Sequence, residues 1–585
     1  MNKKEISIIP HRKKIISPFQ KKILGVNLEI TRTGFFGGLS AQMLNNRKLY
    51  MGETSVDGWE AENFERITDR IEDSLCLSNY IILKKGGSMR QTSEVIQLKS
   101  GEEYEAKVWI KALSKNANIT FGVENIKKTF LVNADEKQYC ALSFTFKGED
   151  ISNGSFFIEA SDNIKVFQAS LMPVNNFYGM RPDVIEKLKK ISPTSIRFPG
   201  GCAADHFDWK ESLKAPQFRK PADGLSKSAF LFRDTFNQDT LDIGINEFMM
   251  LCKELNSEPE YTISLVLSDG EDVKNIVEYF NGDVTTKYGA IRQSLGFDAF
   301  NVHLWYVGNE AFYFGGKFRD DTLLAAERTE ELISAIKEKD NQAKVVIGVH
   351  WRPLCQKWSI DFINKLKCDY DYVSFHDYTG DLTDETLGNK GKQTKEMLED
   401  NFLDGTNFGL EFYRNELFNG SLENVRICVD EWNYSWGKKT TTALFFSNAI
   451  QLHFLAKSNM KYHIDRAAFF MPVNEGMISV KGAECKMEAT GEMFRLFANH
   501  KGGKVIECET DYNILDVLCT DHGDFLFLSV VNRRSEDVLI NIDGFTEADE
   551  IKTDEYGFES CNYELLKTRV PVIHGHSMMF FTVKK

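Results

Sequence analysis

Several features that would assign a function at once are missing from the 585-residue sequence. No run of about 18 apolar residues is present, which argues against a membrane-spanning helix. The first ten residues are basic and contain no long apolar stretch, so we expect no secretory or transit peptide and predict a cytoplasmic protein. The 11 cysteines form no C-x-x-C pair and no compact spacing, which favours a reducing compartment over a disulfide framework.

Motifs for metal binding and an excess of positive charge are missing as well. The 11 histidines include no H-E-x-x-H sequence and no clustered ligand spacing, so we predict no structural or catalytic metal. The net charge of −14 argues against nucleic acid as the main partner, because phosphate backbones attract basic surfaces. Aromatic residues, by contrast, are plentiful. We expect most of the 44 Phe in the core, and a few rings could form faces of a sugar-binding cleft.

The order of the hydrophobic patterns predicts an α/β protein built on a (β/α)₈ TIM barrel. Eight strand-like segments occur, and most are separated by amphipathic helices. They are residues 23–30, 194–198, 260–267, 302–307, 344–350, 371–376, 426–430 and 466–473. Between the first and second segments, apolar residues alternate with polar ones in short runs, which is typical of an antiparallel β-sandwich. The same pattern returns near the C-terminus.

These changes of pattern divide the chain into five regions. Residues 1–20 are expected to be an N-terminal strand that joins the C-terminal β domain. Residues 21–56 hold the first barrel strand and its loop, in which 39–47 has helical propensity. An inserted β-sandwich occupies 57–177, the rest of the barrel occupies 178–498, and a C-terminal antiparallel β-sandwich occupies 499–585.

Two of the predicted barrel strands end in similar polar sequences. The stretch HLWYVGNEAF places Glu310 after Asn309, and RICVDEWN places Glu431 before Asn433. Catalytic groups of such barrels lie at the C-terminal ends of the strands, and paired carboxylates cleave glycosidic bonds. One carboxylate must keep a proton, so its site should raise its pKa, whereas hydrogen-bond donors should surround the other. The pattern alone does not say which glutamate has which role.

These two stretches, together with three others, resemble glycoside hydrolase family 51, most of whose members are α-L-arabinofuranosidases with a retaining barrel domain. The other three are GVNLEI followed by GGLSAQMLNNR, then SIRFPGGCAADHFDWKESL, and VSFHDY. All five occur in the family's order over most of the chain. The resemblance implies that Glu310 is the acid/base and Glu431 the nucleophile. It implies that His376 and Tyr378 hold these two carboxylates. It also implies that Glu29 is a sugar-binding acid and that Asn309 binds a sugar hydroxyl.

Four further positions are candidates for the substrate site, and the family comparison places two of them, Cys202 and Met471, at the border of the sugar pocket. Many family members have Asn where this chain has Cys202, although some also have Cys, and many have Gln where it has Met471. Trp209 is interpreted either as a stacking wall of the pocket or as a packing residue of the barrel rim. Arg197, inside the barrel mouth, needs a carboxylate partner, and we expect it to orient Glu29 or Glu310.

The resemblance implies a retaining exo-glycosidase that removes terminal α-L-arabinofuranosyl groups from arabinofuranose-containing oligosaccharides. Such a reaction needs no cofactor, and the family is often homo-oligomeric. Cys202 and Met471 leave open another activity on the same scaffold, on a different furanoside, a β-glucan or a xylan. From a different class comes a non-catalytic sugar-binding protein, which would have no use for a pair of glutamates. The inserted sandwich is either a working carbohydrate-binding module or a structural spacer.

Overall fold

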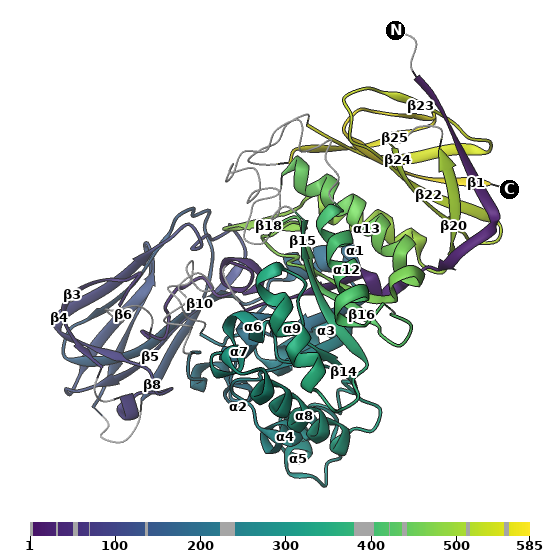
Figure 1. Cartoon of the computed structure of the whole chain (residues 1–585). Coiled ribbons are helices and arrows are strands. Elements are labelled where there is room, and N and C mark those ends of the chain that lie inside the picture. The colour runs from purple at the N-terminus through teal and green to yellow at the C-terminus, as the bar shows by residue number, and fades with distance from the viewer. Residues whose placement is uncertain are drawn as a thin grey trace.

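A central barrel lies between two β-rich parts of the chain, with the insertion on one side and the C-terminal sheet on the other (Figure 1). The computed structural model describes residues 4–30, 33–50, 56–68, 71–134, 139–222, 240–379, 403–420, 422–435, 441–510, 515–554 and 561–584. Among these residues, no helix has both the length and the apolar character that crossing a membrane requires.

Eight parallel strands close the barrel, which confirms the predicted (β/α)₈ fold. Neighbouring strands pair in the order β11-β12-β13-β14-β15-β16-β17-β2. Their bounds are β2 Gly25–Asn27, β11 Ser195–Phe198, β12 Glu258–Ile263, β13 Leu304–Val307, β14 Lys344–Ile347, β15 Tyr372–Tyr378, β16 Ile427–Asn433 and β17 Ile464–Phe470. All eight segments expected from the sequence supply one strand each. The carboxyl ends of parallel strands share one face of the barrel, so residues distant in sequence meet there.

Helices surround this barrel and pack apolar faces against it. The longer ones are α1 Pro182–Ile191, α3 Ile245–Leu255, α4 Gly270–Asn281, α5 Lys287–Ser294, α8 Thr322–Lys339, α9 Pro353–Lys365, α12 Asp404–Phe412, α13 Thr442–Tyr462 and α14 Ala489–Phe497. Pro182 occupies the first turn of α1, where its missing N–H costs no hydrogen bond. The helix expected over 39–47 is wrong, because this segment contains a bridge at Ser40 followed by extended chain and turns.

The insertion between β2 and β11 forms an eight-stranded antiparallel sheet around its own core. Its strands are β3 Glu60–Ile67, β4 Tyr80–Thr92, β5 Glu103–Ala112, β6 Ala117–Val123, β7 Ile126–Val132, β8 Cys140–Lys147, β9 Ser155–Ala160 and β10 Ile164–Pro173. The long strand β4 pairs with β10 through its first half and with β9 through its second half. Gly86 and Gly87 lie between the two halves, so β4 connects two parts of the sheet.

The C-terminal sheet includes the first strand of the chain. Its order is β25-β24-β27-β22-β21-β20-β1-β23-β26. The bounds are β1 Lys4–Pro18, β20 Lys504–Thr510, β21 Leu515–Asp521, β22 Phe525–Asn532, β23 Val538–Asn541, β24 Phe545–Thr553, β25 Tyr563–Thr568, β26 Val572–Ile573 and β27 Ser577–Lys584. β1 runs antiparallel to β20 and parallel to β23, so it joins two parts of the sheet. A small hairpin, β18 Ile478–Lys481 and β19 Glu484–Met487, follows the last barrel strand.

Alternation along β1 provides a direct test of its contribution to stability. Ile8 is 3% exposed in the core of the C-terminal sheet, whereas its neighbour Ile9 is 50% exposed. We expect Ile8→Ala to destabilise this sheet by about 2–5 kcal/mol, because it leaves a cavity, and Ile9→Ala to have little effect. Urea unfolding followed by fluorescence would measure the difference. Equal effects of the two substitutions would contradict the burial of only one face of β1.

Candidate active site

Glu310 stands three residues beyond the end of β13. Its backbone has a φ of 41°, in the left-handed region, where it begins the short helix α6 Ala311–Phe314. Non-glycine residues seldom adopt this conformation, and such outliers cluster at functional sites. The local chain thereby turns away from the barrel directly after Glu310, whose side chain is 14% exposed at the mouth.

Glu431 lies inside β16 rather than after it, and two hydrogen-bond donors hold its carboxylate. The Arg197 guanidinium donates to Oε1 over 3.1 Å, and the Tyr378 hydroxyl donates to Oε2 over 2.9 Å. Both donors are almost fully buried. Donors of this kind favour the ionised form of a carboxylate, as expected for a group that acts as a nucleophile.

One histidine contacts both of the predicted catalytic glutamates. His376, on β15 between the strands of the pair, places its Nδ1 atom 2.8 Å from Glu310 Oε1 and 3.5 Å from Glu431 Oε2. Two carboxylate oxygens that approach one nitrogen atom this closely lie near each other. The arrangement favours the separation of about 5–5.5 Å typical of retaining glycosidases over the larger distance in inverting ones.

Asp430 also contacts His376, although the sequence did not mark it as a site residue. Its Oδ2 atom lies 3.4 Å from His376 Nε2 and 3.2 Å from the Arg197 guanidinium, and its side chain is fully buried. Successive strand residues normally point to opposite faces, so Asp430 and Glu431 should not share one neighbour. A bulge allows it, because Ser374 pairs with Cys428 while His376 pairs with Glu431, which leaves one extra residue on β16.

Arg197 connects the two strand ends from inside the barrel. Besides Glu431 and Asp430, its guanidinium donates to Asn309 Oδ1 over 2.7 Å. The expectation that it orients Glu29 or Glu310 is therefore wrong, since its contacts are with the second glutamate and with the asparagine beside the first. A guanidinium with several donors can bind two partners on separate strands, which fixes their relative positions.

Two glycines after β11 allow the chain to pass next to both Glu29 and Glu431. Gly200 has a φ of +113°, and a Cβ atom there would lie 2.3 Å from the Cβ of Glu29. A Cβ atom on Gly201 would lie 2.2 Å from Glu431 Oε1. Only glycine fits at these positions without displacing a carboxylate. The Glu29 side chain is buried and accepts a hydrogen bond from the Ala203 amide over 2.9 Å.

Cys202 fills the space between Asn309 and Glu310. Its thiol accepts a hydrogen bond from Asn309 Nδ2 over 3.3 Å and donates to Glu310 Oε2 over 3.6 Å. Burial, with the nearby carboxylates, raises the pKa of the thiol well above its usual value. The neutral thiol thus serves as a weak donor to Glu310.

The two remaining predicted positions are both buried, in different places. Met471 is 1% exposed and packs with Tyr378 and Phe470, next to the residue that holds Glu431. Trp209 is 4% exposed, donates its indole N–H to Asp272 over 3.1 Å, and packs against Tyr288. Its contacts in the described chain are those of a packing residue at the barrel rim.

The charges of the site are interdependent. Burial alone would lower the pKa of His376, but the combined effect of Glu431, Asp430 and Glu310 is larger and raises it well above its usual value. Burial raises the pKa of Glu310, yet the hydrogen bond and charge of His376 lower it more. Burial raises the pKa of Glu431, against the opposing charges of His376 and Arg197. The expectation of a raised pKa at the acid/base is therefore wrong for Glu310, whose pKa is lowered, whereas burial leaves the pKa of Glu431 raised.

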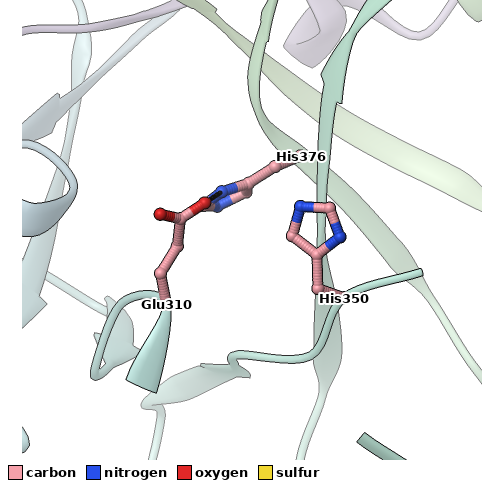
Figure 2. Close-up of side chains that lie close together, drawn as sticks. All are labelled: Glu310, His350 and His376. Atoms are coloured by element: carbon pink, nitrogen blue, oxygen red, sulfur yellow. Dashed lines mark hydrogen bonds and ion pairs between the residues drawn. The ribbon is translucent and has the colours of Figure 1, made fainter. Parts of the chain in front are cut away.

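A second histidine, His350, completes a group that could resemble a metal site. Ligand atoms of Glu310, His350 and His376 lie within 4.8 Å of one another (Figure 2). Zn²⁺ accepts such a set of two imidazoles and a carboxylate. However, His350 Nδ1 accepts a hydrogen bond from the Arg352 amide over 3.1 Å, which leaves its proton on Nε2, the nitrogen that faces the group. His376 Nδ1 is engaged with Glu310, so a proton shared between these two residues fits the arrangement better than a metal.

The described site can be compared with known proteins. The family model of the alpha-L-arabinofuranosidase 1 domain matches residues 187–381, a stretch that includes Arg197, Glu310 and Tyr378. The chain is related to glycoside hydrolase family 51.

Curated relatives agree with this family 51 assignment at low identity. An intracellular exo-α-(1→5)-L-arabinofuranosidase of Acetivibrio thermocellus is 24% identical over 279 residues, which cover 46% of this chain and 52% of the relative. An intracellular exo-α-L-arabinofuranosidase of Bacteroides ovatus is 23% identical over 392 residues, 63% of this chain and 73% of the relative. The alignment thus spans about half the length of the first relative.

Solved family 51 structures match the fold over nearly the whole chain. The arabinose-bound α-L-arabinofuranosidase MgGH51 superposes with a TM-score of 0.73 at 14% identity, covering 99% of this chain and 100% of the other. A thermostable family 51 α-L-arabinofuranosidase of Thermotoga petrophila gives a TM-score of 0.62 at 17% identity, with the same coverage. At these identities the likeness concerns the fold alone.

Different protonation states of the two histidines follow from this geometry. His376 should stay protonated above pH 6.5, whereas burial lowers the pKa of His350 to about 3. Stability from His376 is therefore present below pH 6.5 and lost as pH rises through its folded pKa. His350 acts in the other direction, because the unfolded chain binds its proton first as pH falls below 6.5. NMR of histidine-labelled protein, assigned with His376→Gln and His350→Gln, would measure both charges. A charged His350 at pH 6 would contradict this reading.

Proposed function

We propose that the protein is a retaining exo-glycosidase that hydrolyses terminal α-L-arabinofuranosyl groups from arabinose-containing oligosaccharides. The match to an arabinofuranosidase domain and the names of the relatives support the substrate class. Two of these relatives are described as intracellular, which supports action on small oligosaccharides inside the cell.

One observation carries the proposal for the reaction. Glu310 and Glu431 come from different strands, yet both contact His376 Nδ1, at 2.8 Å and 3.5 Å. A sugar bound between them would meet one carboxylate at its anomeric carbon and the other at its glycosidic oxygen. A sugar-binding protein without catalysis gains nothing from two buried carboxylates held this closely, because their mutual repulsion costs free energy.

Double displacement accounts for both groups. In the first step a Glu431 oxygen attacks the anomeric carbon, the bond to the leaving oxygen breaks, and Glu310 gives its proton to that oxygen. In the second step the Glu310 carboxylate takes a proton from water, whose oxygen attacks the same carbon and releases Glu431. Two inversions leave the configuration of the released arabinose unchanged.

His376 supplies a place for the proton between turnovers. The raised pKa of His376 and the lowered pKa of Glu310 favour a protonated imidazole beside an ionised Glu310, joined by a hydrogen bond of 2.8 Å. Transfer of that proton to Oε1 of Glu310 creates the acid without any exchange with solvent. Asp430 on the opposite nitrogen holds the ring in the orientation that this transfer needs.

The remaining predicted residues surround the space for the terminal sugar. We expect Glu29 to accept a hydrogen bond from a sugar hydroxyl and Asn309 to donate one. Cys202 lies between Asn309 and Glu310. Met471 packs with Tyr378 and Phe470 and is proposed to form an apolar part of the pocket wall. The low polarity of this wall limits which hydroxyl orientations the pocket can satisfy.

Four further predictions accompany the proposal. The five regions 1–20, 21–56, 57–177, 178–498 and 499–585 are proposed as the domain plan, with the insertion as a structural spacer. Cytoplasmic action and homo-oligomeric assembly remain predictions, as does the requirement for no cofactor.

Glycosidase activity and the roles of the two glutamates can be tested together. We expect wild type to release nitrophenol from 4-nitrophenyl α-L-arabinofuranoside, and Glu310→Ala and Glu431→Ala to lose at least about 10³-fold in kcat on unactivated arabinosides. Azide should rescue both variants with different stereochemistry. Glu431→Ala should yield the glycosyl azide of inverted configuration, and Glu310→Ala the one of retained configuration.

Glu327→Ala, on the exposed face of α8, is the matched control and should retain full activity. If the enzyme cleaves only another furanoside, a β-glucan or a xyloside, the proposed substrate is wrong but the proposed mechanism stands. Sugar binding without turnover on any glycoside would instead indicate a lectin.

A further inference from the structure

The strand order separates the polar groups of the barrel mouth into two arcs. Glu431, Glu29 and Cys202 follow or lie on β16, β2 and β11, which are neighbours on one side of the barrel through β17. Glu310 and His350 follow β13 and β14 on the other side. An acid that protonates the glycosidic oxygen stands between the two sugars, so groups beyond it face the sugar that leaves.

His350 is held firmly at the end of β14. Its backbone exchanges two hydrogen bonds with the Ser359 hydroxyl, each 2.9 Å long, and the side chain is almost fully buried. The Arg352 amide donates to Nδ1 over 3.1 Å. This contact leaves the proton of the neutral ring on Nε2, because one nitrogen of a neutral imidazole accepts and the other donates.

That Nε2–H group faces Glu310 and His376. Figure 2 shows the Nδ1 edge of His350 turned away and the other ring nitrogen facing Glu310 and His376. Burial and the positive charge of His376 keep the ring uncharged at neutral pH. The ring therefore offers one fixed donor beside the acid, and it does not compete with Glu310 as a proton source.

Aromatic side chains give this donor a wall. Phe312 meets the His350 ring edge to face at a centroid distance of 5.2 Å, and half-buried Tyr313 lies 6.1 Å away. Both rings follow Glu310 on α6. An apolar face next to a single aimed donor is a common design for binding a sugar, whose C–H groups pack on rings while a hydroxyl takes the hydrogen bond.

We propose that His350 binds the leaving-group sugar, with its Nε2–H donating to a hydroxyl or ring oxygen of that sugar. The inference rests on the proposed glycosidase function and extends it to the second sugar. His350 then contributes to the preference for a sugar leaving group over a simple aryl one, and it takes no part in the transfer of the proton.

Two substrates distinguish this role from others. We compare 4-nitrophenyl α-L-arabinofuranoside, whose leaving group has no sugar hydroxyl, with α-1,5-linked arabinobiose. His350→Ala should lower kcat/KM on arabinobiose by about 3- to 10-fold, the effect of one lost hydrogen bond, and change the aryl substrate less than 2-fold. His350→Gln, which keeps an N–H donor, should recover part of the loss. The pH profile on the aryl substrate should remain that of wild type.

Every other result overturns the inference. An equal loss on both substrates, or a shifted pH profile, would mean that His350 acts through Glu310 instead. No loss on either substrate would remove it from the site. If wild type cleaves the aryl arabinofuranoside and His350→Ala shows no selective defect on arabinobiose, only this inference is refuted. Wild type that cleaves neither substrate refutes the proposed function, and this inference with it.

Discussion

The charge balance around His376 is the constraint on which the site depends. The imidazole contacts Asp430 through one nitrogen and Glu310 and Glu431 through the other. Arg197 pairs with Asp430 and Glu431. Buried carboxylates at this spacing repel each other, and each needs a positive or donating neighbour. Two cations for three acids leave the cluster one charge short of neutrality. A proton entering it lowers that cost, which makes the site ready to hold and release one.

The barrel, the insertion and the C-terminal sheet contribute unequally to this charge cluster. Within the described part of the chain, the residues of the charge cluster come from the barrel, on β11, β15, β16 and the loop after β13. The insertion has its own core, and the C-terminal sheet has another. Substitutions in those two parts therefore affect the site through stability rather than through contact.

The sequence was sufficient for the strand order and for most of the cluster, because hydrophobic runs that end in polar residues are local signals. It failed where the backbone departs from regular geometry. Asp430 was missed because strict alternation places it on the face opposite Glu431, and only the bulge beside Ser374 brings both to His376. The predicted partners of Arg197 were wrong because a long side chain can reach across strands to residues that the sequence does not indicate. His350 ended a predicted strand, yet nothing local indicated which neighbour its ring would face.

The pairing of β1 and β2 also bears on synthesis of the chain. β1 pairs with β20 and β23, and β2 pairs with β17 through Asn27 and Phe470. On the ribosome these first strands emerge hundreds of residues before those partners exist, whereas the strands of the insertion pair with one another. The insertion can thus fold first and keep the waiting N-terminal strands attached to a compact body. Closure of the barrel then becomes a late event, set by the arrival of the last third of the polypeptide.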